Sequence, residues 1–434
     1  MIWLHLAIVL GAIFLGARLG SIAIGFAGGL GVLALGLLGV PVSQEAIPFD
    51  VIAIIMAVIA AIASMQVAGG MDYLVNLADR LLRRNPRQVT LVAPLVTYFM
   101  TLMAGTGHTA FSTLPVIAEV AKENRIRPSR PLSIAVVSSQ MAITASPISA
   151  AVVFMASVLE PVGVDYLQLL AVAIPSTLLA VVLTSFLANR LGRELSDDEV
   201  YQDRVARGLV SYRGEHDYVE QRGAKFSVLA FLAGIVLVMA YATAISPKVG
   251  LITDPAIPRN EAIITIMLAV AAVNVLVCRL DAVAVLDAQT FKSGMSACVC
   301  ILGVAWLGTT FVNAHIETIK AFAGDVLTGQ PWALAVVLFF AASLLYSQAA
   351  TTKALVPAAL AIGVAPLTVV AAFPAVSALF VLPTYPTLLA AVEMDDTGST
   401  RIGKYVFDHP FMIPGVVNIA IAVALGFAIG SVIL

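Results

Sequence analysis

The residues best suited to binding a solute lie in the stretch 105–115, which reads GTGHTAFSTLP. Two glycines, four hydroxyl side chains, a histidine and a proline here separate the apolar runs 88–104 and 116–120. Neither run reaches the ~20 apolar residues that a membrane-crossing helix needs. A broken backbone is tolerated at membrane depth only where it is buried in protein or lines a watery cavity. The stretch is therefore predicted to line a solute site.

A second stretch, 347–357, repeats this pattern in the other half of the chain. It reads SQAATTKALVP, follows the short apolar run 332–346 and also ends on a proline. Paired interruptions in two halves of an apolar chain are typical of a solute site near the middle of the membrane. We predict two re-entrant hairpins, at about 88–120 and 332–363, whose tips hold the solute. A pair of proline-kinked helices is the alternative.

A further break follows each hairpin, at 143–147 (ITASP) and at 382–386 (LPTYP). Proline removes a backbone donor and ends a helix, and a new half-helix then begins with free N–H groups. Such a helix N-terminus attracts a carboxylate. We expect four half-helix starts to converge, near Thr109, Pro147, Thr352 and Pro386. The alternative for the two later breaks is kinked packing helices whose hydroxyls bond to their own backbone.

The candidate substrate-binding residues all lie in or beside these four breaks. They are Thr106, Gly107, His108, Thr109, Ser112, Thr144, Ser146, Ser149, Gln348, Thr351, Thr352, Lys353, Thr384 and Thr387. Lys353 is the only formal charge expected deep in the membrane, where an ammonium costs about 2.5–3.5 kcal/mol. An anionic solute would compensate it, and extension of the side chain to the outer surface is the alternative. His108 is as well explained by a hydrogen bond to another group of the hairpin as by a contact with the ligand.

Other classes of site find little support. All Asp and Glu residues fall in expected loops or span ends, whereas cation-coupled exchangers usually carry an intramembrane carboxylate. Neither H-E-x-x-H nor G-x-S-x-G occurs, so a membrane-embedded enzyme is the minor alternative. The three cysteines have no metal spacing. We therefore expect no catalytic residue, no metal and no cofactor, and the net charge of −2 gives no sign of a nucleic-acid partner.

The composition requires a polytopic, all-α membrane protein, because 60% of the 434 residues are hydrophobic and 12% are charged. The first residues lack a basic leader, so the first span is expected to be retained. Besides the hairpins, we expect spans at about 2–17, 21–40, 51–70, 131–158, 166–188, 226–246, 261–278, 293–312, 366–392 and 411–434.

The basic residues predict the orientation of these spans. Clusters at 80–87 and 122–130 flank the first hairpin, and both lie in the cytoplasm if that hairpin enters and leaves on one face. With both termini outside, only Lys248, Arg259, Lys320 and Lys353 are not cytoplasmic. The expected localisation is an inner membrane with both termini in the periplasm.

The halves are predicted to be inverted repeats, 1–190 and 226–434, joined by a cytoplasmic linker at 191–225. Each has five spans and one hairpin, and an odd number of spans turns the second half upside down. Pro115 corresponds to Pro357, and Pro147 to Pro386. In the linker, the sequence SDDE at 196–199 predicts a capping box that starts a short helix. The linker is expected to be solvated, and a regulatory docking surface is the alternative.

Several motifs resemble the anaerobic four-carbon-dicarboxylate transporter (Dcu) family, most of all its DcuA branch. They are 11–20 (GAIFLGARLG), 81–86 (LLRRNP), 105–115, 143–152 (ITASPISAAV), 345–350 (LYSQAA), 382–387 (LPTYPT) and 394–398 (MDDTG), and the resemblance runs from end to end. It implies a bacterial inner-membrane carrier of fumarate, succinate, malate and L-aspartate, active in anaerobic metabolism by exchange or uptake. It also implies an elevator mechanism and a homodimer. Relatives with Asn at the position of His108 weaken any essential role for that imidazole. The alternative is a sodium- or proton-coupled symporter of another organic anion.

Overall fold

The computed structural model describes residues 1–19, 22–47, 49–210, 219–245, 251–345, 347–383, 385–403 and 407–434. Over these residues the chain is helical throughout and has no β-strand, which confirms the expected all-α class. Five helices are both long and apolar enough to cross a membrane: Tyr166–Ala188, Ala224–Ala244, Arg259–Cys278, Thr290–His315 and Met412–Ile433. The number of ten spans stays a prediction.

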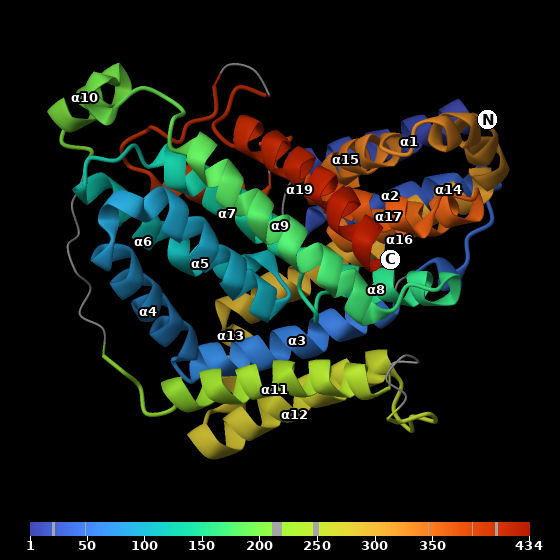
Figure 1. The fold of residues 1–434 in the computed structure, drawn as a ribbon, viewed down its shortest axis with the longest axis horizontal. Coiled ribbons are helices and arrows are strands. Elements are labelled where there is room, and N and C mark those ends of the chain that lie inside the picture. Colours follow the sequence, from blue (N-terminus) through green and yellow to red (C-terminus); the bar gives the residue numbers. More distant parts are fainter. Residues whose placement is uncertain are drawn as a thin grey trace.

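One group of helices, which we call the frame, comes from the start of each half of the chain. It consists of α1 (Ile2–Leu19), α2 (Ala23–Leu37), α3 (Phe49–Val67), α11 (Ala224–Ala244), α12 (Arg259–Cys278) and α14 (Gln289–Gly329). Helices α3, α11 and α12 share one apolar cluster and lie along the lower edge of Figure 1. Helices α1, α2 and α14 share another. A Cβ on Gly303 would lie 1.9 Å from the Gly25 carbonyl oxygen, so the crossing of α2 and α14 requires glycine.

The remaining long helices form a second group, which we call the hairpin body. Its first half is α5 (Val89–Ala104), α6 (Ala110–Glu123), α7 (Ser129–Ile143), α8 (Ala150–Leu159) and α9 (Tyr166–Ala188). Its second half is α15 (Ala333–Leu345), α16 (Gln348–Ala361), α17 (Pro366–Ala372), α18 (Pro386–Met394) and α19 (Met412–Ile433), with the 3-10 turn η6 (Phe373–Ser377) after α17. Apart from Leu82 and Ala242, the largest apolar cluster draws on this body alone and mixes both halves.

The first expected hairpin is a pair of helices whose outer ends lie together. Before it, α4 (Gly70–Arg84) bends by 75° away from α3 and carries Arg83 to the start of α5. Arg83 forms an ion pair with Glu123 at the end of α6. The residues on either side of the hairpin therefore meet at one end of the molecule, as a chain that enters and returns on one face requires.

The hairpins of each half pack against the broken helices of the other. Helix α6 contacts α18, α16 contacts α8, and the last helices of the two halves, α9 and α19, lie against each other. Both expected breaks occur: the first lies between α7 and α8, and the second between η6 and α18. The expected span at 293–312 corresponds to Thr290–His315, and its helix, α14, continues beyond that stretch to Gly329.

The linker begins as a structured segment rather than a free chain. A 3-10 turn, η5 (Leu195–Asp197), precedes α10 (Glu199–Ala206). The predicted cap at Ser196 is wrong by two residues, because this turn occupies its position and the Asp198 side chain accepts the hydrogen bond of the Val200 N–H. Asp198 is also paired with Arg127 at 2.6 Å and with Arg401 at 3.4 Å, which fastens α10 to the hairpin body.

The charge of Asp198 holds this contact together. Burial raises the pKa of its carboxyl, but the hydrogen bond and charge of Arg127, with the charge of Arg401, outweigh burial and lower that pKa below its ordinary value. A lowered folded-state pKa contributes stability above the unfolded-state pKa. That contribution is lost as the pH falls through the lowered value, so the docked linker is an acid-sensitive contact.

Candidate functional site

Four half-helices start inside the hairpin body, and two of them start where they are expected. Helix α18 begins at Pro386, and α6 begins at Ala110 after the 3-10 turn Gly107–Thr109. The other two expectations are wrong by a few residues. Helix α8 begins after Ser149 rather than near Pro147, and α16 begins after Ser347 rather than near Thr352. In both cases a serine cap fixes the start, and for α8 this cap lies two residues after Pro147.

The two pairs of half-helices differ in how their N-termini are satisfied. Ser149 Oγ accepts the hydrogen bond of the Val152 N–H, and Ser347 Oγ accepts that of the Ala350 N–H. In the part of the chain that the structure describes, neither α6 nor α18 has a side-chain cap. These two helices contact each other. Their N-termini therefore offer paired, uncapped positive ends to an anion.

A buried glutamine, Gln140 of α7, connects these elements. Its side chain is 1% exposed, its Oε1 accepts from Gln348 Nε2 at 3.0 Å, and its Nε2 donates to Thr387 Oγ1 at 3.2 Å. Its backbone carbonyl accepts from Ser377 Oγ at 3.1 Å. One residue thus joins the tip of the second hairpin to both sides of the second break. Sequence analysis missed Gln140, although a lone amide within an apolar span was a visible signal.

The tip of the first hairpin lies against the same glutamine. A Cβ on Gly107 would be 3.1 Å from Gln140 Nε2, so glycine lets the backbone approach the amide. Gly105 ends α5 with φ +67°, a left-handed conformation that favours glycine. A Cβ there would also lie 3.0 Å from Ile148 Cγ1 in the first break. Both glycines therefore fix the tip between the first break and Gln140.

The structure satisfies several of the expected hydroxyls by their own backbone. Thr144 donates to the Met141 carbonyl, Thr351 to that of Ser347 and Thr352 to that of Gln348. Thr109 Oγ1 lies 3.0 Å from Thr101 Oγ1 across the hairpin. For Thr144 this contact matches the backbone-bonding alternative.

Ser146 is the expected hydroxyl that stands apart. It is fully buried in the first break, and its Oγ has no hydrogen-bond partner among the described residues. A buried, unpaired hydroxyl at a helix break can form a hydrogen bond with a ligand. Three other expected residues lie outside what the structure describes: the side chains of His108 and Ser112, and all of Thr384. Thr106 and Gly107 lie at the first hairpin tip beside Thr109.

Lys353 lies on a different face of α16 from Gln348. At 100° per residue the two side chains are about 140° apart around the helix axis, whereas Thr352 stays near Gln348. The Lys353 ammonium is half-buried, with Nζ 5.8 Å from the ring centroid of Phe154 on α8, and it interacts with the charge of Asp50. The structure therefore places Lys353 beside the capped pair α8 and α16 and not on Gln140.

The arrangement suits an anion with two carboxylates better than a metal. Polar groups of the second hairpin tip and of the second break bond to Gln140, the first hairpin tip lies against it, and the charge at these elements is the partial positive charge of helix ends. Among the described residues, no three His, Cys, Asp or Glu side chains come together to hold a metal ion. The geometry can bind and orient a small acidic solute, and the described residues present no acid–base pair at the site.

Comparison with known proteins gives a consistent result. The whole chain, residues 1–434, matches the family described as "Anaerobic c4-dicarboxylate membrane transporter". It is 63% identical to the C4-dicarboxylate transporter DcuA of Wolinella succinogenes and 60% identical to that of Escherichia coli K12, each over 100% of both chains. The anaerobic C4-dicarboxylate transporter DcuB of Escherichia coli O6:H1 is 36% identical over 98% of this chain and 97% of its own.

A solved structure shares the fold at low sequence identity. The Alcanivorax borkumensis YdaH transporter superposes with a TM-score of 0.54 and 15% identity, over 86% of this chain and 85% of that one. At this identity the likeness concerns the fold alone. These three curated relatives are named as transporters, and transporters are not a class of enzyme.

Proposed function

Because the chain belongs to the family of anaerobic C4-dicarboxylate membrane transporters, we propose that it exchanges four-carbon dicarboxylates across the bacterial inner membrane. The proposed substrates are fumarate, succinate, malate and L-aspartate. The observation that carries the proposal is the contact of Gln140 with the second hairpin tip and the second break, beside the first hairpin tip. It gathers polar donors from both halves of the chain at one buried point.

The two half-helix pairs are proposed to take one carboxylate each. One carboxylate would bind the uncapped N-termini of α6 and α18, where Gln140 and Thr387 add donors. The other would approach α8 and α16, where Ser146 supplies an unpaired hydroxyl and Lys353 a nearby positive charge. A rigid pair of sites at fixed separation selects dicarboxylates over acids with one or three carboxylates. The remaining expected residues are proposed to line the same site.

We also propose that the hairpin body moves against the frame as an elevator. Its support is the division of most buried apolar residues, since one cluster holds the hairpins and broken helices of both halves while two others come mainly from the frame, with Ala104, Ile148 and Val153 of the hairpin body among them. The cross-packing of α6 with α18 and of α16 with α8 supports two inverted repeats. The homodimer and the linker boundary at 191–225 remain proposals from the sequence.

Exchange is favoured by the cost of moving a dianion. Inward movement against an inside-negative potential costs about 4.6 kcal/mol per 100 mV, at about 2.3 kcal/mol for each charge. Swapping one dianion for another cancels this cost. Uptake without exchange would require co-transported cations, which backbone carbonyls at the breaks are able to bind.

Counterflow in proteoliposomes tests this function. With fumarate inside, we expect labelled succinate and L-aspartate to accumulate, while lactate and citrate do not. Varying sodium and membrane potential should leave the exchange of fumarate for succinate nearly unchanged, because both are dianions and their charges cancel. Equal exchange of lactate or citrate would contradict the paired sites. Accumulation that depends on a sodium or proton gradient would favour the symporter alternative.

The proposed membrane orientation is tested by labelling. We expect cysteines at Arg84 and Asn124, in a background without native cysteines, to react only with an impermeant reagent added from the cytoplasmic side. Both residues are exposed and flank the first hairpin, whose ends are joined by the ion pair of Arg83 and Glu123. A cysteine at the exposed Val162, in the turn after α8, serves as the control for the opposite face. Reaction of positions 84 and 124 from opposite sides would exclude a re-entrant hairpin.

A further inference from the structure

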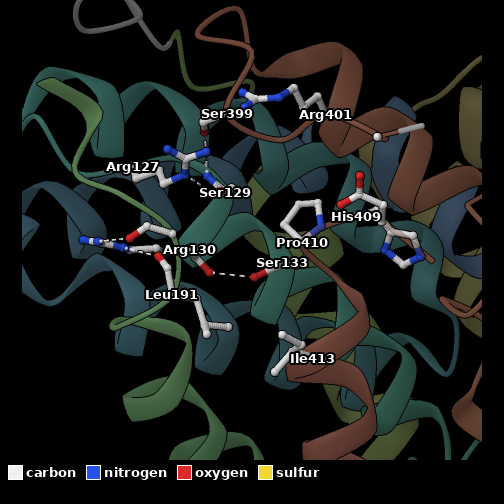
Figure 2. Close-up of a pocket in the computed structure, with 13 residues that line it drawn as sticks. Arg127, Ser129, Arg130, Ser133, Leu191, Ser399, Arg401, His409, Pro410 and Ile413 are labelled. Atoms are coloured by element: carbon white, nitrogen blue, oxygen red, sulfur yellow. Dashed lines mark hydrogen bonds between the residues drawn. The ribbon is translucent and has the colours of Figure 1, made fainter. Parts of the chain in front are cut away.

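A pocket lies at the end of the hairpin body where the linker docks. Its volume is about 360 Å³, and it is bounded by the starts of α7 and α19 and by the first residues of the linker. Figure 2 shows Arg127, Ser129 and Arg130 along one wall and His409 and Pro410 along the other. The transport proposal makes no use of this pocket.

Three arginines line the pocket, and each keeps donors that the protein does not use. Arg127 binds Ser129, Arg193 and Asp198 through Nε and Nη1, and Arg130 binds Leu191, Gly192 and Glu194 through Nε and Nη2. Arg401 binds Asp198 and Gly398 through Nη1. Over the described chain, Arg127 Nη2, Arg130 Nη1 and Arg401 Nη2 have no protein partner. Because the other bonds fix each guanidinium plane, the free donors are held in place.

The pocket has further features that suit an anion. The N-termini of α7 and α19, helices of 15 and 22 residues, both border it and add partial positive charge. His409 lines it at 7% exposure, and its Nδ1 has no partner among the described residues. One carboxylate, that of Asp408, also lines the pocket and opposes an anion. Asp198 and Glu194 also carry negative charge near the pocket, but they pair with Nη1 of Arg127 and Arg401 and with Nη2 of Arg130, which leaves the other terminal nitrogens to the pocket.

The other side of the pocket is apolar and continues along α19. Ile413 lines the pocket and is 56% exposed. The exposed residues of α19 then recur every three or four positions, at Ile413, Val416, Ala420, Ala424 and Ala428. This spacing gives one continuous apolar face of small side chains. A basic pocket at the start of an exposed apolar helix face matches a molecule with an anionic head and an acyl tail.

We propose that this pocket binds the phosphodiester head of an anionic membrane phospholipid, with an acyl chain along the exposed face of α19. Arg127, Arg130 and Arg401 bind the phosphate oxygens through their free terminal nitrogens. The bound lipid thereby connects α7, α19 and the linker at the membrane surface. The proposed membrane orientation assigns this site to the cytoplasmic leaflet, and binding itself does not depend on which substrate is carried.

The test is titration of the purified full-length protein in detergent with phosphatidylglycerol, followed by native mass spectrometry. We expect saturable binding that weakens about 10-fold in Arg130→Gln, since a charge-assisted hydrogen bond is lost. Asp408→Asn should tighten binding, because it removes the opposing charge from the pocket. Arg207→Gln is the matched control, since Arg207 is an exposed arginine of the linker whose partner within the described ranges is Asp203. It should bind lipid as the unmodified protein does.

Equal affinity for phosphatidylglycerol in the unmodified protein, Arg130→Gln and Asp408→Asn would overturn the proposal. Displacement of the lipid by an equal concentration of inorganic phosphate would show a soluble anion as the ligand and would overturn the lipid assignment. If Arg130→Gln fails to fold, Asp408→Asn still decides, because tighter binding is expected there. Transport is not part of the measurement, so failure here leaves dicarboxylate exchange untouched.

Discussion

Gln140→Leu is expected to reduce dicarboxylate exchange on the order of 100-fold while the protein stays folded in the membrane. Leucine fills a similar volume but removes the acceptor of Gln348 Nε2 and the donor to Thr387 Oγ1. A buried polar group left without its partner costs about 1–3 kcal/mol, and two such groups are affected. The second hairpin tip and the start of α18 then lose their common anchor. Initial rates of succinate–fumarate counterflow in proteoliposomes measure the effect.

Two further variants separate a role at the site from a general packing role. Ser139→Ala changes the preceding residue of α7. Its buried hydroxyl donates to the Val136 carbonyl of the same helix and has no other partner among the residues that the structure describes, so transport should be nearly unchanged. Gln140→Glu retains the acceptor for Gln348 but loses the donor to Thr387, and its negative charge repels a dianion. It should therefore be as inactive as Gln140→Leu. Full transport by Gln140→Leu would remove this residue from the proposed site.

The broken elements were predictable because their signals are local. Glycine, proline and hydroxyl residues at 105–115 and 143–147 interrupt apolar runs, and the helices end there. Gln140 was not predictable in the same way. Its partners, Gln348 and Thr387, lie 208 and 247 positions away along the chain, so only the packing of the two halves brings them together. A single amide in an apolar helix gives no hint of its distant partner.

The start of α8 differs from its prediction because a serine cap, and not the preceding proline, sets it. Pro147 lies near the first break, but Ser149 provides the hydrogen bond that starts α8. In the linker, Asp198 rather than Ser196 caps α10, because residues 195–197 already form a 3-10 turn. A cap requires extended backbone at its own residue as well as an oxygen, and the sequence specifies only the oxygen. The backbone conformation at Ser149 and Ser347 therefore distinguishes the capped pair, α8 and α16, from the uncapped pair, α6 and α18.

Lys353→Ala is expected to weaken dicarboxylate binding about 10-fold or more without unfolding the protein. The ammonium is half-buried beside α8, and a charge-assisted hydrogen bond to a carboxylate contributes about 1.5–3 kcal/mol. Binding of succinate to purified protein, measured by calorimetry, gives the change directly. Lys292→Ala is the control, because Lys292 is an exposed lysine that pairs with Asp287 away from the hairpins.

The position of Lys353 makes this the more demanding of the two tests. Its side chain points toward Phe154 and interacts with Asp50, about 140° around α16 from Gln348. If the ammonium acts on the substrate, Lys353→Arg should restore binding only in part, because a planar guanidinium replaces a compact ammonium poorly in a tight hairpin tip. If Lys353→Ala binds succinate with unchanged affinity, the ammonium does not act on the substrate and interacts with the charge of Asp50 instead. The dianion is then held by Gln140, Ser146 and the uncapped N-termini of α6 and α18, and the effect of Gln140→Leu should be undiminished.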